Sequence, residues 1–126
     1  MKKPPLANAE LAIMNLLWKT DRITAREIRE KLYPDEKKAQ HGTVQRLLQR
    51  LEEKGYIDRD RSLSVHFFSA KVDRQDYAGS QLESLASRLT GGSLAPIITH
   101  FVEEKKLSRD DIMELRAILD EGLDKE

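Results

Sequence analysis

Polar side chains suited to base recognition are concentrated between residues 38 and 61. Arginine can donate two hydrogen bonds to the O6 and N7 atoms of guanine, and glutamine can pair in a similar way with adenine. Arg46 is the best candidate for a guanine contact, whereas Gln45 could contact adenine or lie at the edge of the surface. Arg50 and Lys54 follow farther along and are better placed for phosphates. The candidate DNA contacts are Lys38, Gln40, His41, Thr43, Gln45, Arg46, Arg50, Lys54, Arg59 and Arg61.

These candidates have alternative interpretations. Arg59 and Arg61 flank a predicted turn, where they could contact the DNA backbone or be solvated surface charges. Exposed arginine and glutamine side chains are also common on surface helices, so the whole set could instead bind an acidic protein partner. Retention on DNA that falls steeply with salt would favour the DNA interpretation.

The sequence has no pattern typical of a catalytic, metal or cofactor site. His41, His66 and His100 are widely spaced, none has another histidine three or four residues away, and the chain has no cysteine. Gly91-Gly92 is not followed by the Lys-Ser/Thr of a phosphate-binding loop. We therefore expect neither an enzyme nor a bound metal or cofactor.

Charge is distributed unevenly along the 126 residues. The net charge of the chain is zero, but residues 1–72 hold 15 basic and 10 acidic residues, whereas residues 73–126 hold 7 and 12. DNA binding requires a basic surface on one face of a protein rather than a positive net charge of the whole chain. The positive net charge of residues 1–72 therefore suits DNA binding. No apolar run approaches the roughly 18 residues of a membrane span, and no signal peptide is evident. We expect a cytoplasmic protein without membrane insertion.

Two short helices are predicted near the start of the chain. A broad apolar stripe predicts a helix over about residues 9–19, followed by a link at 21–23 that could hold one brief strand. Thr24 and Glu27 have the spacing of a capping box, in which each side chain bonds the other residue's backbone N–H. They predict the start of a second helix, which Pro34 ends.

The candidate contacts lie mainly on a third helix, predicted over residues 41–54 after a polar turn at 35–40. Its buried face is predicted to consist of Val44, Leu47, Leu48 and Leu51. Residues 57–61 and 65–69 are predicted as the two strands of a hairpin. Three helices followed by a hairpin is the order of a winged helix-turn-helix domain. We therefore predict a mainly α protein in which residues 1–72 form this DNA-binding domain.

Residues 73–126 are predicted to form three further helices with apolar stripes. These helices are too few and too short to bury those stripes alone, so we predict a C-terminal helical dimerisation domain. The alternative is that they fold back on the N-terminal domain. The candidate dimerisation residues are Leu82, Leu85, Leu89, Leu94, Ile97, Ile98, Phe101, Val102, Ile112, Leu115, Ile118 and Leu119.

Three blocks of the sequence, in this order, resemble the BlaI/MecI-type penicillinase repressor family of winged-helix regulators. Residues 9–18 (AELAIMNLLW) are similar to its opening signature, and residues 43–57 (TVQRLLQRLEEKGYI) to its recognition helix and the start of its wing. Residues 91–119 (GGSLAPIITHFVEEKKLSRDDIMELRAIL) are similar to its dimerisation segment. The resemblance implies a homodimer that binds a double-stranded dyad operator and represses transcription.

The resemblance also implies a mode of release, although this chain departs from the family pattern. A membrane sensor with a metalloprotease domain cleaves many members at an Asn-Phe bond, and the matching bond here is His100-Phe101. By its spacing, Phe101 is also a residue of the predicted dimer core. His41 and Gly42 differ from the residues usual in the family, so the operator sequence does not follow from relatives. The cysteine-rich tail of the copper-responsive branch is absent.

Overall fold

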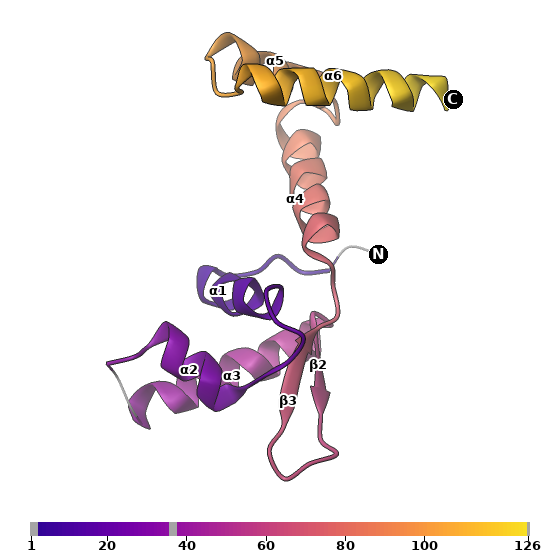
Figure 1. Cartoon of the computed structure of the whole chain (residues 1–126). Helices are drawn as coiled ribbons and strands as arrows, with labels where there is room; N and C mark the ends of the chain where they lie inside the picture. The colour runs from indigo at the N-terminus through magenta and orange to yellow at the C-terminus, as the bar shows by residue number, and fades with distance from the viewer. Residues whose placement is uncertain (1–2, 36–37, 126) are drawn as a thin grey trace. The chain divides into compact units, whose positions relative to one another are not determined.

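The computed structural model of the protein describes residues 3–35 and 38–125, with the side chains of residues 38–40 outside the description. The chain divides into two compact units, Met1–Gln81 and Leu82–Glu126. Figure 1 labels most of its elements, which in chain order are α1 (Asn8–Leu17), β1 (Ile23–Thr24), α2 (Ala25–Leu32), α3 (Lys38–Lys54), β2 (Ile57–Asp60), β3 (Phe67–Ala70), α4 (Arg74–Leu89), α5 (Ala95–Glu103) and α6 (Arg109–Asp124).

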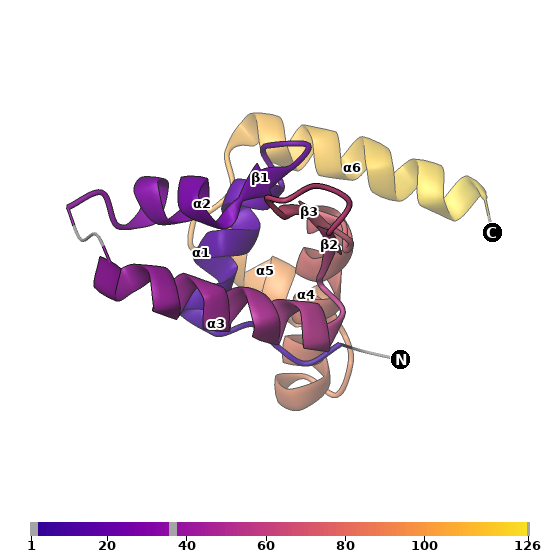
Figure 2. The ribbon, with the colours of Figure 1, turned by 90° about the horizontal axis from the view of Figure 1, so that it is seen from below.

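The core of the first unit lies between α1, α2, α3 and one face of the sheet. Figure 2 shows α2 and α3 lying alongside each other. Ile13 of α1, Ile28 of α2 and Phe68 of β3 are almost completely buried there. The predicted buried face of α3 is confirmed, since Val44, Leu47, Leu48 and Leu51 are all buried. This face fixes α3 to the core and determines which of its side chains meet solvent.

The described residues form a three-stranded antiparallel sheet in the order β1-β3-β2. Ile23 of β1 pairs with Phe68, and Ile57 of β2 pairs with Ala70. The brief strand expected between the first two helices is therefore present, and it joins the hairpin as a third strand. Helices α1–α3 with this sheet make a winged helix-turn-helix domain, which confirms the predicted fold class.

The hairpin, here called the wing, has shorter strands and a longer loop than predicted. β2 ends at Asp60, whose Oδ1 accepts a 2.9 Å hydrogen bond from the backbone N–H of Ser62. This turn takes the following residues out of the strand ladder, and Leu63 and Val65 are exposed in the loop. The predicted strand ends at residues 61 and 65 are therefore wrong, and the wing loop covers residues 61–66.

The predicted start of the second helix is confirmed, whereas the predicted start of the third helix is wrong. The Thr24 hydroxyl accepts a hydrogen bond from the Glu27 N–H at 3.2 Å, and the Glu27 carboxylate accepts one from the Thr24 N–H at 3.1 Å, as the capping box predicts. The third helix begins at Lys38 rather than at His41. Lysine, alanine and glutamine at 38–40 all favour helix, and Gly42 does not interrupt it.

The first turns of α4 pack against the winged-helix core. The Tyr77 ring lies 6.1 Å from the Trp18 ring and 5.8 Å from the Tyr56 ring, centroid to centroid. The Tyr77 hydroxyl accepts a hydrogen bond from the Leu6 N–H at 3.2 Å, and the Trp18 indole N–H donates to the Val72 carbonyl at 2.8 Å. These contacts explain why the first unit extends into α4, whereas the predicted domain boundary at 72/73 stays a prediction.

The second unit consists of the rest of α4 with α5 and α6. Helices α5 and α6, all of whose residues are described, contain no buried residue. The Ser108 hydroxyl caps α6 by accepting a 3.0 Å hydrogen bond from the Asp111 N–H. Within residues 3–35 and 38–125, none of the helices combines the length and apolar character that crossing a bilayer requires.

Candidate nucleic-acid interface

The buried face of α3 leaves a strip of polar side chains on its opposite side. His41, Gln45, Arg46, Gln49 and Arg50 are all exposed, and we call these five residues the α3 strip. They recur along the helix at the spacing that places residues on one side. The strip carries two guanidinium groups, two amides and an imidazole, which together offer both donors and acceptors. This is the set of groups that the edges of DNA bases recognise in the major groove.

Two surface hollows border the α3 strip. The first hollow, of about 340 Å³, lies between α3, the start of α2 and the wing, with His41, Gln45 and His66 in its lining. The second hollow, of about 480 Å³, is lined by residues of α3 and β2 that include Arg46. Gln45 lines both hollows, so it lies well within the strip rather than at its edge.

The two predicted wing contacts, Arg59 and Arg61, are both paired with Glu52 of α3. The Arg61 guanidinium donates to Glu52 Oε2 at 3.1 Å and remains 56% exposed at its side chain. Arg59 Nε lies 3.3 Å from Glu52 Oε1, without the alignment of a hydrogen bond, and the guanidinium carbon lies 4.7 Å from the centroid of the Phe68 ring. Glu52 thus links β2 to α3, and Arg61 is the more accessible of the two cations.

Lys54 has an internal partner that its place in the sequence does not reveal. Its ammonium lies 2.7 Å from Glu10 Oε1 and 3.3 Å from the Pro5 carbonyl oxygen. Glu10 is only 1% exposed. Burial by itself raises the pKa of Glu10, but the hydrogen bonds from Lys54 and from the Ala7 N–H, with nearby positive charge, outweigh burial and lower it. Lys54 therefore neutralises a buried carboxylate and ties the end of α3 to the segment before α1.

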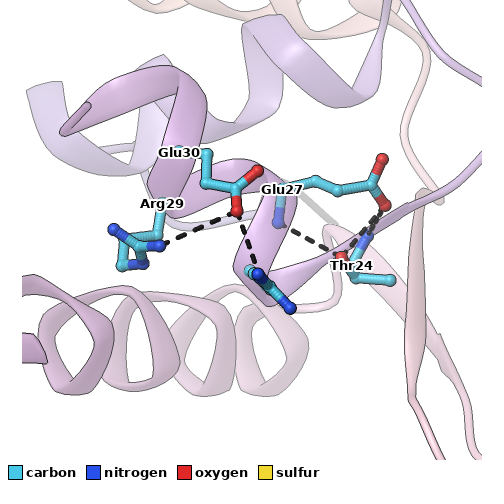
Figure 3. A network of polar contacts seen from close by, with 5 residues as sticks. Thr24, Glu27, Arg29 and Glu30 are labelled. Atoms are coloured by element: carbon cyan, nitrogen blue, oxygen red, sulfur yellow. Dashed lines mark hydrogen bonds and ion pairs between the residues drawn. The ribbon is translucent and has the colours of Figure 1, made fainter. Parts of the chain in front are cut away.

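The start of α2 borders the first hollow and is held by a local polar network, shown in Figure 3. Thr24 and Glu27 form the capping box, while the Glu30 carboxylate lies 3.1 Å from Arg26 Nε and 3.8 Å from an Arg29 nitrogen. Each of these contacts joins residues at most four positions apart in the sequence, so the helical backbone of α2 is sufficient to bring them together. Arg26, which lines the first hollow, is thereby paired with Glu30.

Some members of the site could not be identified from periodicity alone. His66 and Arg26 line the first hollow beside His41, although they come from the wing and from α2. Neither belongs to a repeating pattern, because the tertiary packing of the wing against α2 and α3 brings them together. The predicted winged-helix arrangement is the signal that could place His66 near α3.

The remaining predicted contacts are placed as follows. Thr43 is half-buried on α3, at the edge of the α3 strip. The backbones of Lys38 and Gln40 lie in the first turn of α3, but their side chains fall outside the described residues. Among the residues that the structure describes, no group of histidine, aspartate and glutamate side chains could hold a metal ion.

The predicted dimerisation residues form much of the exposed apolar surface of the second unit. Leu89 is 72% exposed and Leu119 is 64% exposed, values unusual for leucines on a packed helix. Ile97 and Leu115 are half-buried. The other members are exposed, namely Leu82, Leu85, Leu94, Ile98, Phe101, Val102, Ile112 and Ile118. Met113 and Leu123 are also exposed and were not predicted.

Comparison with known proteins shows similarity to penicillinase repressors over most of the chain. The family model described as Penicillinase repressor matches residues 6–121. A penicillinase repressor of Bacillus licheniformis is 31% identical over 122 residues, which cover 96% of this chain and 94% of that protein. The methicillin resistance regulatory protein MecI of Staphylococcus aureus (strain N315) is 29% identical, with 90% of this chain and 92% of that protein covered. The solution structure of the DNA-binding domain of the repressor BlaI is 28% identical, covers 60% of this chain and 92% of that chain, and has a TM-score of 0.49.

Proposed function

Since the chain belongs to the penicillinase repressor family, we propose that it is a dimeric DNA-binding repressor that occupies a dyad operator and blocks transcription. The named relatives are a penicillinase repressor and a regulatory protein, neither of them named as an enzyme, which agrees with the expectation of a protein without catalytic activity. A repressor of this kind acts in the compartment that holds the DNA, in line with the expected cytoplasmic location.

The observation that carries this proposal is the α3 strip on a rigidly held helix. Four buried apolar side chains fix α3 to the core, while Gln45, Arg46 and Gln49 point away from it. Arg46 can donate both arms of its guanidinium to a guanine, and the two glutamines can pair with adenine or with water at the base edges. Arg50 and the exposed Arg61 are assigned to backbone phosphates.

The dimer is proposed from the second unit. Its helices α4–α6 expose a continuous series of apolar side chains from Leu82 to Leu123, and α5 and α6 bury nothing by themselves. Exposed apolar surface of this kind marks a protein interface, and a second copy of the chain is the partner that suits a dyad operator. Two recognition helices would then enter successive major grooves about 34 Å apart.

Release from DNA follows from weakening of the dimer. Each winged-helix domain alone has few contacts, so affinity depends on both domains binding together. The His100-Phe101 bond, where the family resemblance places the cut by a membrane sensor protease, lies inside α5. A protease binds extended chain, so cleavage requires α5 to unfold locally and would then remove part of the exposed apolar surface.

The direct test is footprinting of the full-length protein on the DNA upstream of its own gene. We expect two protected half-sites one helical turn apart, and the protection should be lost as salt rises. A matched footprint with Arg46→Ala should lose the specific protection. Uniform weak protection of all sequences, or binding to acidic polypeptides in place of DNA, would instead support a protein-interaction module.

A further inference from the structure

The first hollow holds two of the chain's three histidines on different walls. His41 comes from the first half of α3, and His66 comes from the end of the wing loop. Two arginines, Arg26 of α2 and Arg59 of β2, line the same hollow. The hollow therefore brings together four side chains that can bear positive charge, one from α2, one from α3 and two from the wing.

In the proposed complex with DNA, the first hollow would lie on the path of the phosphate backbone. When α3 occupies a major groove and the wing lies beside it over the adjoining minor groove, the phosphate backbone between the two grooves runs between α3 and the wing. The first hollow opens between these two elements. A backbone phosphate is thus the chemical group that would meet the four side chains.

The charged neighbours of the two rings determine how a phosphate changes their protonation. His41 shares the hollow with Arg26, and its Nε2 atom lies 3.4 Å from Nε2 of the Gln45 amide. An amide can turn to serve either charge state of the ring. A phosphate in the hollow would place negative charge beside the His41 ring, and a nearby negative charge favours the protonated form of an imidazole.

His66 has a mixed charged environment on the wing. Arg59 shares the hollow with it but is paired with Glu52. Asp60 is the nearby carboxylate, and hydrogen bonds from Ser62, with the charges of Arg22 and His66, lower the pKa of Asp60. Asp60 is also 3.7 Å from Arg22. Asp60 therefore stays ionised near neutral pH.

We propose that DNA binding by this chain is coupled to proton uptake by His41 and His66, which together hold one backbone phosphate in the first hollow. This inference rests on the proposed DNA-binding function. Protonation adds an N–H donor and a positive charge to each ring, and both are directed at the phosphate. The operator is accordingly held more tightly in acid than in alkaline conditions.

The direction and size of the effect follow from linkage. An unperturbed histidine titrates near pH 6.5, so lowering the pH from about 8 to about 6 protonates rings that face a phosphate. If the phosphate raises the pKa of a ring by about one unit, affinity rises up to about tenfold per histidine over this range. Each added phosphate contact also makes the dependence of log affinity on log salt steeper by about 0.9.

The experiment measures the dissociation constant of the full-length protein for its upstream DNA and for random duplex by fluorescence anisotropy, between about pH 6 and about pH 8 at fixed ionic strength. Wild type should bind about ten times or more tightly at the lower pH, with a steeper salt slope. The double variant His41→Gln/His66→Gln should bind with little pH dependence. His100→Gln, in α5, is the matched control and should keep the wild-type dependence.

A second measurement needs no variant. NMR titration of the ring protons should show the pKa values of His41 and His66 rising when duplex is added, while that of His100 stays the same. Equal wild-type affinity at both pH values, pH dependence that survives in the double variant, or unchanged ring titrations would each overturn the proton coupling. Absence of DNA binding at every pH would instead contradict the proposed function itself.

Discussion

Arg46 and Arg50 both lie on the α3 strip, but their surroundings differ. Arg46 borders the second hollow beside Gln45 and Gln49, whereas the charge of Arg50 acts on Glu10 near the end of α3. Arg46→Ala should therefore lose roughly 1–3 kcal/mol of binding to the operator and relax its specificity. Arg50→Ala should weaken binding to all duplexes alike and reduce the salt slope by about one unit. Unchanged binding of both variants to operator and random DNA would show that the recognition face is elsewhere.

Glu10 is the residue on which we expect acid stability to depend. Its buried carboxylate binds Lys54 and the Ala7 N–H, so Glu10→Gln should lower the free energy of unfolding at neutral pH by roughly 1–3 kcal/mol. The pKa of the folded state lies below the ordinary value of 4.5. The stability that this carboxylate contributes is thus present above about pH 4.5 and lost as the pH falls through the folded-state value.

Denaturant unfolding at neutral and at acid pH measures both effects. Glu30→Gln is the matched control, because it removes an exposed carboxylate that pairs with Arg26 on the surface of α2. Its cost should be close to zero. Equal stability of the Glu10 and Glu30 variants at neutral pH would show that the buried pair does not stabilise the fold.

At the scale of elements, the start of α2 depends on one hydroxyl. Thr24 is the N-cap whose oxygen accepts the Glu27 N–H, and it also borders the first hollow. Thr24→Ala should cost about 1 kcal/mol of stability, whereas Thr24→Ser, which keeps the oxygen, should cost much less. Thermal unfolding of the two variants checks this. Equal losses would mean that the methyl group matters more than the cap.

Elements whose signals are local were predictable from the sequence. The buried face of α3 and the capping box of α2 each depend on spacings of three or four residues, and both are confirmed. Helix α3 begins at Lys38, three residues before its predicted start, because a polar run at 35–40 resembles a turn although its second half favours helix. The ends of the wing strands also differ from the prediction. Val65 belongs to a residue type that favours strands, but it lies in the loop before β3.

Contacts between distant residues were not predictable in this way. Lys54 pairs with Glu10, 44 residues earlier, and no periodic pattern connects the two. The first hollow likewise joins His41 to His66 through the packing of the wing. Surface charges with an internal partner therefore resemble free DNA contacts in the sequence, and the ten candidate contacts stay a prediction.

At the scale of the whole molecule, the exposed apolar surface of the second unit should control affinity. Phe101→Asp places a charge among those side chains, so we expect it to yield monomers that keep the winged-helix fold but bind the operator much more weakly. Asp124→Ala is the control, since Asp124 is exposed and lies on the side of α6 opposite Leu115 and away from Ile112 and Ile118. Sedimentation and binding of the two variants measure the effect. A dimeric, fully active Phe101→Asp protein would place the dimer contact elsewhere.

Sedimentation of the protein with its own upstream duplex, compared with a scrambled duplex, tests the central claim most directly, because it reports stoichiometry and sequence preference together. We predict two chains on each operator duplex, with affinity that falls steeply between about 50 and about 200 mM salt and far weaker binding to the scrambled sequence. One chain per duplex, or equal binding to both sequences, would contradict a dimer that recognises DNA through α3.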